Sequence, residues 1–127
     1  MEDAIYVNDE EQVIVQNQKQ IIQILNELAK QHEMLKVSFS HDTCLTSVIS
    51  VDAHHHVVYL DIGIDDAFNN RLLASHHVVF SKDDGVRLKW PSTQLTLTQL
   101  KDGKAIKIAL PHNVMRMTRR EFLRLAT

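Results

Sequence analysis

The chain places its hydrophobic residues with two different periods, and the change of period separates a helix from a set of strands. The hydrophobic residues after position 20 recur at the spacing of one helix face, at Ile21, Ile22, Leu25, Leu28 and Ala29. Asn17 is a suitable N-cap, and Gln20 stands three residues later, as a capping box requires. The pattern predicts a helix of roughly four turns that begins after Asn17 and buries one side.

After about residue 33 the hydrophobic residues recur at every second position, which is typical of strands with one buried face. Runs with this period predict strands over residues 35–39, 45–52, 57–62, 78–80, 86–90, 94–100 and 104–110. Residues 65–74 interrupt the pattern and are expected to form a loop or one helical turn. Pro91 is predicted to end a strand, and Pro111 is predicted to end the sheet.

These elements predict a mainly β domain, in which one N-terminal helix is followed by six or seven short antiparallel strands in a small barrel or sandwich. The helix and strands occupy residues 15–112. Residues 1–14 contain five acidic residues and no Lys or Arg, so we expect an acidic, flexible lead-in there. Residues 113–127 follow the last predicted strand as a basic linker.

Composition places the chain among soluble globular proteins. Its 127 residues amount to one domain or slightly less. A net charge of −2 and a pI near 6.4 argue against bulk binding to nucleic acid or to an acidic membrane. Cys44 is the single cysteine, so we expect no internal disulfide and a reducing compartment. Because the chain has no signal-peptide pattern and no apolar run near about 18 residues, it is predicted to be cytoplasmic, without membrane insertion.

Several polar clusters could suggest a metal site or an enzyme, but their spacing favours turns. The histidines at 54–56 are consecutive, and neighbouring residues on a strand face opposite sides, which is poor chelation geometry. Residues 65–66 lack the ligand spacing of a calcium loop, whereas Asp61 lies in an apolar run and is expected to make a structural hydrogen bond. The Ser-His-Asp sequence at 40–42 cannot form a triad from adjacent positions. We therefore expect no metal and no catalytic residues.

The last twelve residues differ from the rest of the chain because they are strongly basic. Residues 116–127 contain four arginines and one glutamate, a local charge of about +3. Arg120 and Arg124 are four residues apart, and Arg119 precedes the first of them. Guanidinium groups pair with phosphates and stack on bases, so this spacing suggests a site for a compact anionic ligand. The alternative is the solvated last turn of an amphipathic helix, where the helix dipole favours basic residues.

The order of these features resembles a known family. The leading helix is followed by four segments that carry the resemblance, at residues 46–52, 59–61, 72–73 and 85–90. Leu110 and Pro111 then precede the arginine-rich tail, which is the most specific part of the likeness. Over about residues 17–127 the chain is similar to the N-terminal domain of YcgR-like flagellar brake proteins, running into the start of a PilZ domain.

The resemblance implies a small split β-barrel of PilZ-like architecture in a non-enzymatic regulator of motility. In that family a linker Arg-x-x-x-Arg motif binds cyclic di-GMP together with the C-terminal PilZ barrel. Arg120 and Arg124 match the motif, and Arg119 is the adjacent basic residue. The implied partners are cyclic di-GMP, the protein's own C-terminal PilZ domain and a flagellar motor protein, with recruitment to the flagellar basal body. No cofactor is implied.

A second motif of the family, (Asp/Asn)-x-Ser-x-x-Gly, does not occur in these 127 residues. The chain is therefore expected to be a fragment cut at a domain boundary, or a protein that lost its PilZ barrel. In either case it carries half of a nucleotide site. We expect it to bind cyclic di-GMP weakly, or not at all, by itself.

Two other functions are compatible with parts of the sequence. A small barrel could bind nucleic acid or another protein through the same basic tail. Nucleic-acid binding predicts an affinity that falls steeply with salt and has little nucleotide specificity, and the acidic pI argues against it. An enzyme that uses the His and Asp residues is the weakest alternative, because no set of them converges in the sequence.

Overall fold

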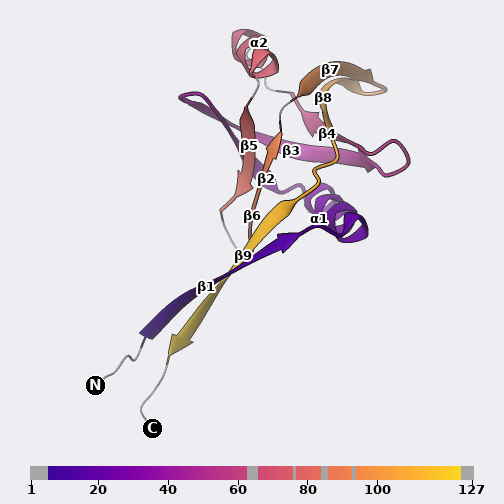
Figure 1. The fold of residues 1–127 in the computed structure, drawn as a ribbon. Coiled ribbons are helices and arrows are strands. Elements are labelled where there is room, and N and C mark those ends of the chain that lie inside the picture. The colour runs from indigo at the N-terminus through magenta and orange to yellow at the C-terminus, as the bar shows by residue number, and fades with distance from the viewer. Residues whose placement is uncertain (1–5, 63–65, 76, 84–85, 93, 124–127) are drawn as a thin grey trace.

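The computed structural model describes residues 6–62, 66–75, 77–83, 86–92 and 94–123. Within these ranges the chain forms nine antiparallel strands and two helices, and the strands make one sheet that does not close (Figure 1). The mainly β, antiparallel class expected from the sequence is confirmed. The expected count of six or seven strands is too low, and a second helix is present.

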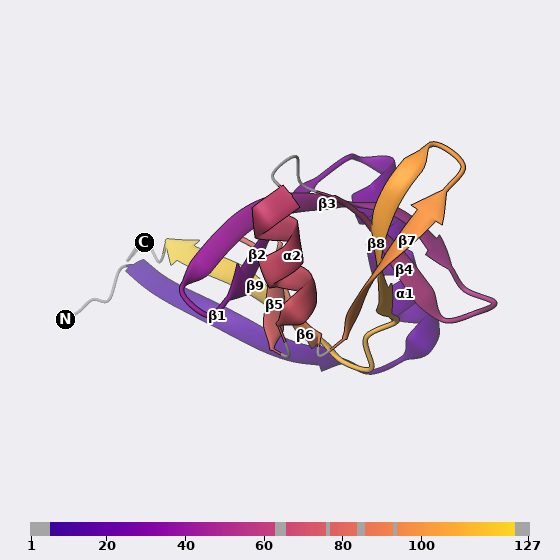
Figure 2. The ribbon, with the colours of Figure 1, turned by 90° about the horizontal axis from the view of Figure 1, so that it is seen from above.

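The strands and helices follow the chain in the order β1 (Tyr6–Val15), α1 (Gln18–Lys30), β2 (Met34–Phe39), β3 (Asp42–Asp52), β4 (Val57–Asp61), α2 (Asp66–Ala74), β5 (Val78–Lys82), β6 (Arg87–Ser92), β7 (Leu95–Leu100), β8 (Gly103–Ala109) and β9 (Val114–Leu123). Their order in the sheet is β1-β9-β6-β5-β2-β3-β4-β8-β7, so the first and last strands of the chain are neighbours. Seen from above, the strands curve around the centre of the molecule, with α2 over one end (Figure 2).

Helix α1 has the start and the buried face that the sequence predicts. The Asn17 side chain accepts a hydrogen bond from the backbone N–H of Gln20 at 3.1 Å, which satisfies one of the donors that a helix start leaves open. Ile21, Leu25 and Leu28 are buried on the same face. The helix packs this face against the sheet, beside β3 (Figure 1).

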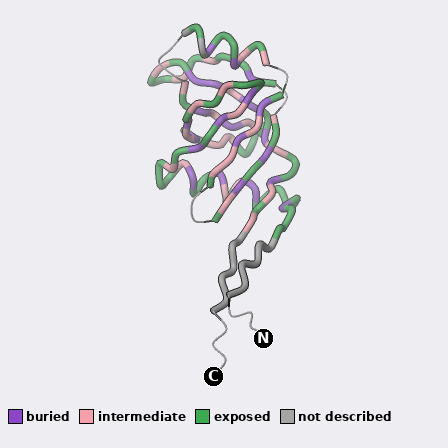
Figure 3. The backbone as a smooth tube through the Cα atoms, turned by 90° about the vertical axis from the view of Figure 1, so that its left-hand side faces the viewer, coloured by how far each residue is buried: buried purple, intermediate pink, exposed green. Residues whose placement is uncertain are grey.

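The hydrophobic core lies between α1 and the inner face of the curved sheet, and its buried positions recur along the strands (Figure 3). The largest buried side chains are Trp90 on β6 and Phe80 on β5, which are register partners. Their rings stack with centroids 5.5 Å apart and planes 20° from parallel, a favourable offset arrangement. This pair joins β5 to β6, the strand that neighbours β9 in the sheet.

The terminal segments that the structure describes are both strands. Residues 6–15 form β1, so the expected flexible lead-in is wrong for residues 6–14, while residues 1–5 lie outside the described residues. Val114–Leu123 form β9, within the stretch expected to be a linker. The prediction that Pro111 ends the sheet is wrong, since Pro111 lies in the connection between β8 and β9. Pairing between segments more than 100 residues apart leaves no local signal in the sequence, and both segments are rich in charged residues.

Two further local predictions need correction. Strand β6 continues through Pro91, which is the register partner of Val79. β9 pairs with β6 only at residues 87–89, so the missing N–H of Pro91 costs no bond on that side. The segment expected to be a loop or single helical turn is the nine-residue helix α2, whose Leu72 is buried in the core.

Candidate ligand-binding site

Strand β9 carries the arginines that the sequence singled out, and it lies between β1 and β6. β1 pairs with it from Val114 to Leu123, whereas β6 pairs with it only at Met115–Met117. Beyond residue 117, β9 and β1 therefore form a two-stranded ribbon that projects from the body of the molecule (Figure 1). The arginine-rich segment is extended up to Leu123, so the helical alternative for this stretch is wrong.

The structure gives backbone positions for two of the three predicted site residues. Arg120 is directly opposite Asp9 in the ladder, and Arg119 is directly opposite Glu10. Adjacent residues of a strand belong to opposite faces, so Arg119 and Arg120 hold positions on different faces of the ribbon. Arg124 lies outside the described residues, as do the side chains of Arg119 and Arg120.

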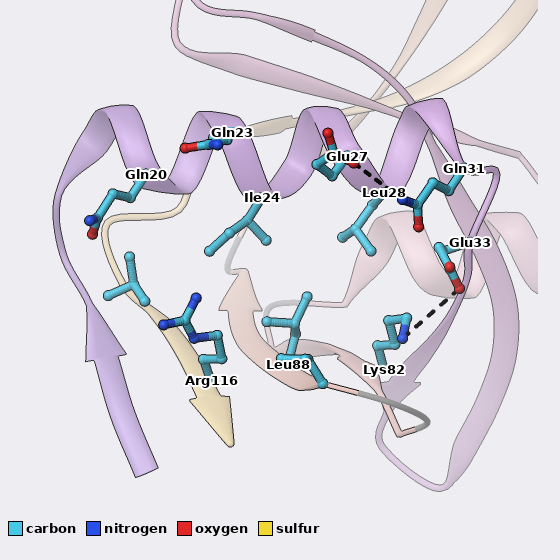
Figure 4. Close-up of a pocket in the computed structure, with 12 residues that line it drawn as sticks. Gln20, Gln23, Ile24, Glu27, Leu28, Gln31, Glu33, Lys82, Leu88 and Arg116 are labelled. Carbon is cyan, nitrogen blue, oxygen red and sulfur yellow. Dashed lines mark hydrogen bonds and ion pairs between the residues drawn. The ribbon is translucent and has the colours of Figure 1, made fainter. Parts of the chain in front are cut away.

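Arg116 is a fourth arginine on β9, and the sequence interpretation did not include it in the site. It is exposed, and it stands four residues before Arg120 on the same face of the strand. The repeated spacing of Arg116, Arg120 and Arg124 was the sequence signal that could have drawn attention to it. Its side chain lines a groove between β9 and helix α1 (Figure 4).

The groove has a volume of about 460 Å³ and runs along α1. Its apolar lining comes from the helix and from the strands beneath it, at Val15, Ile24, Leu28, Val86 and Leu88. Three glutamines and one glutamate line the helix side, at Gln20, Gln23, Glu27 and Gln31. At one end Arg116 lies near Gln20, and at the other the Lys82 ammonium lies 3.9 Å from the Glu33 carboxylate (Figure 4).

The histidine cluster forms a turn between β3 and β4, as its spacing suggested. The Asp52 carboxylate accepts a hydrogen bond from the backbone N–H of His55 at 3.1 Å and lies 2.8 Å from the Nδ1 of that ring. These two hydrogen bonds, the side-chain one foremost, lower the pKa of Asp52. Among the described residues no group of three or more His, Cys, Asp or Glu side chains is placed to hold a metal ion.

The remaining polar candidates have structural positions. Residues 40–41 form the turn between β2 and β3, and Ser40 has a positive φ of 53°. Asp61 makes the structural hydrogen bond expected of it, but through its backbone: its carbonyl accepts a bond from the buried Thr46 hydroxyl at 2.8 Å, while its side chain is exposed. Neither helix that the structure describes is long and apolar enough to cross a membrane.

An open antiparallel sheet with one capped helix on its inner face and a basic last strand defines a domain of the split-barrel, PilZ-like class. The family model described as "Flagellar regulator YcgR, PilZN domain" matches residues 14–116. This chain belongs to that family.

A relative from Methylotenera mobilis, a flagellar brake protein YcgR, is 57% identical over all of this chain and 51% of its own length. A second, from Janthinobacterium, is 27% identical over 89% of this chain and 46% of the relative. The chain spans about half the length of the curated relatives it matches.

Solved structures with the same fold come from Escherichia coli. The YcgR-N domain of YcgR matches with a TM-score of 0.74 and 17% identity, over 81% of this chain and 93% of that one. YcgR in complex with c-di-GMP matches with a TM-score of 0.77 and 18% identity, over 84% of this chain and 47% of that one. At this level of identity the likeness establishes the fold.

Proposed function

We propose that this chain is the N-terminal regulatory part of a cyclic di-GMP receptor that controls the flagellar motor. It acts without catalysis, and it contributes Arg119, Arg120 and Arg124 to a nucleotide site that a following PilZ domain completes. The observation that carries the proposal is the Arg120-x-x-x-Arg124 spacing directly after the region that matches the YcgR PilZN family. The complex of a relative with c-di-GMP supports it.

The chemistry of the arginines suits this ligand. Cyclic di-GMP carries two phosphates and flat guanine rings, and a guanidinium can form paired hydrogen bonds with a phosphate or stack on a base. Residues 118–123 pair with β1 alone, and an isolated two-stranded ribbon is marginally stable in water. Ligand binding to arginines on such a segment can therefore shift the arrangement of the two domains that flank it.

The partners follow from the same role. The domain that completes the site is the first partner, and a motor component at the flagellar basal body is the second. The domain division that we propose places the elements from α1 to β8 before residue 113 and the linker to the PilZ domain after it. Strand β9 then belongs to both, because its first residues pair with β6 and its later residues carry the arginines.

The test is a calorimetric titration of cyclic di-GMP into two proteins. The first is this chain alone, and the second is this chain joined to the second half of the 57%-identical relative. Binding in the longer protein and weak or absent binding in the short one is the expected result. Absence of binding in both, with the longer protein folded by circular dichroism, would refute the proposal.

The same proteins distinguish the alternative function, nucleic-acid binding by the basic tail, from cyclic di-GMP binding. A single-stranded RNA that bound this chain alone, with an affinity falling steeply between 50 and 200 mM salt, would favour it. The opposed acidic residues Asp9 and Glu10 argue against it, because they offset the positive charge of the ribbon.

A further inference from the structure

The groove between α1 and strands β6 and β9 is not used by the proposed nucleotide site, and its shape and lining suit a different ligand (Figure 4). Its helix side runs from Gln20 to the C-cap Gln31, eleven residue steps, which corresponds to about 16 Å at the helical rise. Extended peptide advances about 3.3 Å per residue, so about five residues would cover that length.

The polar groups of the groove match a peptide backbone. Gln20, Gln23 and Gln31 recur on one side of the helix, and each amide offers both donors and an acceptor. An extended peptide presents alternating N–H and C=O groups that such amides can bond. Beneath this row, Ile24, Leu28 and other apolar side chains can receive an apolar side chain of the ligand.

The charges of the groove determine which end of a bound peptide lies at Arg116. Lys82 is engaged by Glu33, and the Glu27 carboxylate accepts a hydrogen bond from the Gln31 amide at 3.2 Å. Arg116 is exposed and makes no hydrogen bond or ion pair with the residues that the structure describes. Its guanidinium is the one lining cation without an acidic partner in this part of the chain, and its fork suits a carboxylate.

A nucleotide fits the same groove poorly. A cyclic dinucleotide would bring two phosphates toward Glu27 and Glu33, and a single unpaired arginine would have to balance them. None of the described residues that line the groove is aromatic, so no ring is present on which a base could stack. Protein chemistry therefore accounts for the lining better than nucleotide chemistry does.

We propose that this groove binds an extended segment of a partner protein, about five residues long, with an apolar side chain in its middle and an Asp or Glu at the Arg116 end. Charge complementarity at Arg116 and the row of glutamine amides carry this assignment. The proposal stands apart from the nucleotide site, because it uses none of Arg119, Arg120 and Arg124.

The experiment selects ligands without bias, by panning this chain against a library of random decapeptides displayed on phage. The expected result is a set of peptides that share an acidic residue two to four positions from a Leu, Ile, Val or Met. Binding of one synthetic peptide from the set is then measured by fluorescence anisotropy. Arg116→Glu is expected to weaken it by about tenfold or more, because a charged hydrogen bond is replaced by repulsion.

Two more variants make the test specific to the groove. Val86→Lys adds a charge to the apolar lining at an exposed position, and it is expected to weaken the peptide without unfolding the domain. Lys89→Glu makes the same charge change as Arg116→Glu on the neighbouring strand, outside the groove, and should leave affinity unchanged. Peptides without an acidic residue, or equal losses from Arg116→Glu and Lys89→Glu, would overturn the proposal. So would a concentration-dependent dimer that Arg116→Glu abolishes, since the occupant would then be a second copy.

Discussion

Arg120 stands directly opposite Asp9 in the ladder between β9 and β1, and Arg119 stands opposite Glu10 in the same way. The most acidic part of the chain is thus held in register with its most basic part. Oppositely charged residues at directly opposed positions of a sheet contribute about 0.2–1 kcal/mol per pair. Residues 118–123 pair with no strand other than β1. We therefore expect these opposed charges to contribute a large share of the stability of the ribbon.

Reversing the charge of Asp9 is expected to loosen the ribbon. Asp9→Lys puts two cations at directly opposed positions. Like charges there destabilise the strand pairing by about as much as opposite charges stabilise it. Amide exchange at residues 118–123 should become about fivefold faster, while exchange at Val37 and Val58 in the central strands is unchanged. Asp102→Lys makes the same charge change at an exposed position in the turn between β7 and β8 and serves as the control. Equal acceleration by both variants would mean that net charge, and not register, sets the order of this segment.

Removing the linker arginines should abolish nucleotide binding, if the proposed function holds. Arg120→Ala and Arg124→Ala, each in the chain joined to the second half of the 57%-identical relative, are expected to lose cyclic di-GMP binding in calorimetry. The melting temperature should change little, because truncating a charged side chain usually alters stability by no more than about 0.5 kcal/mol. Lys101→Ala, an exposed cation in the turn between β7 and β8, should bind like the parent protein. Parental affinity in either arginine variant would exclude that arginine from the site.

Local chemistry made much of the body of the fold predictable. Asn17 and the hydrophobic stripe that begins at Ile21 specify a capped helix within one segment. Turn residues between alternating runs specify the hairpins, and Gly103, with a φ of 140°, shows why a glycine begins β8 directly after the turn from β7. In each case the residues that determine the element are close together in the sequence.

The unpredicted parts depend on contacts between distant segments. β1 and β9 are strands because they pair with each other, and neither has an alternation of apolar residues strong enough to specify a strand alone. Pro91 is tolerated because β9 leaves β6 before it, a fact of topology and not of local sequence. Arg116 is part of a groove only because α1 is packed above it, so the arginine spacing could draw attention to this residue but could not show that it lines a groove.

The core pair Trp90 and Phe80 joins β6, the neighbour of β9, to β5, and truncating it should be costly. Trp90→Ala is expected to lower the free energy of unfolding by about 3–5 kcal/mol in urea titrations. Trp90→Phe should cost much less, because the indole Nε1 is buried without a hydrogen-bond partner among the described residues. Leu97→Ala, at an exposed position of β7, should stay within about 0.5 kcal/mol of the parent.

The N-cap of α1 offers a smaller and separate test. Asn17→Ala removes the acceptor for the Gln20 amide, and it is expected to lower the free energy of unfolding by about 1 kcal/mol. Asn17→Asp retains an acceptor at this position and should preserve stability at neutral pH. A loss in the aspartate variant as large as that in the alanine variant would mean that the hydrogen bond is not the stabilising feature.

The turn between β3 and β4 should show a specific dependence on pH. Hydrogen bonds from the ring and the backbone N–H of His55 lower the pKa of Asp52 from its ordinary value of 3.8. A carboxyl whose folded pKa is depressed stabilises the fold above its unfolded pKa, and this contribution is lost as the pH falls through the folded pKa. The carboxyl carbon of Asp52 should therefore titrate by NMR with a midpoint below 3.8. His55→Ala should raise that midpoint, whereas His54→Ala leaves the ring of His55 in place and should shift it little. A midpoint at or above 3.8 in the parent chain would contradict the hydrogen-bonded turn.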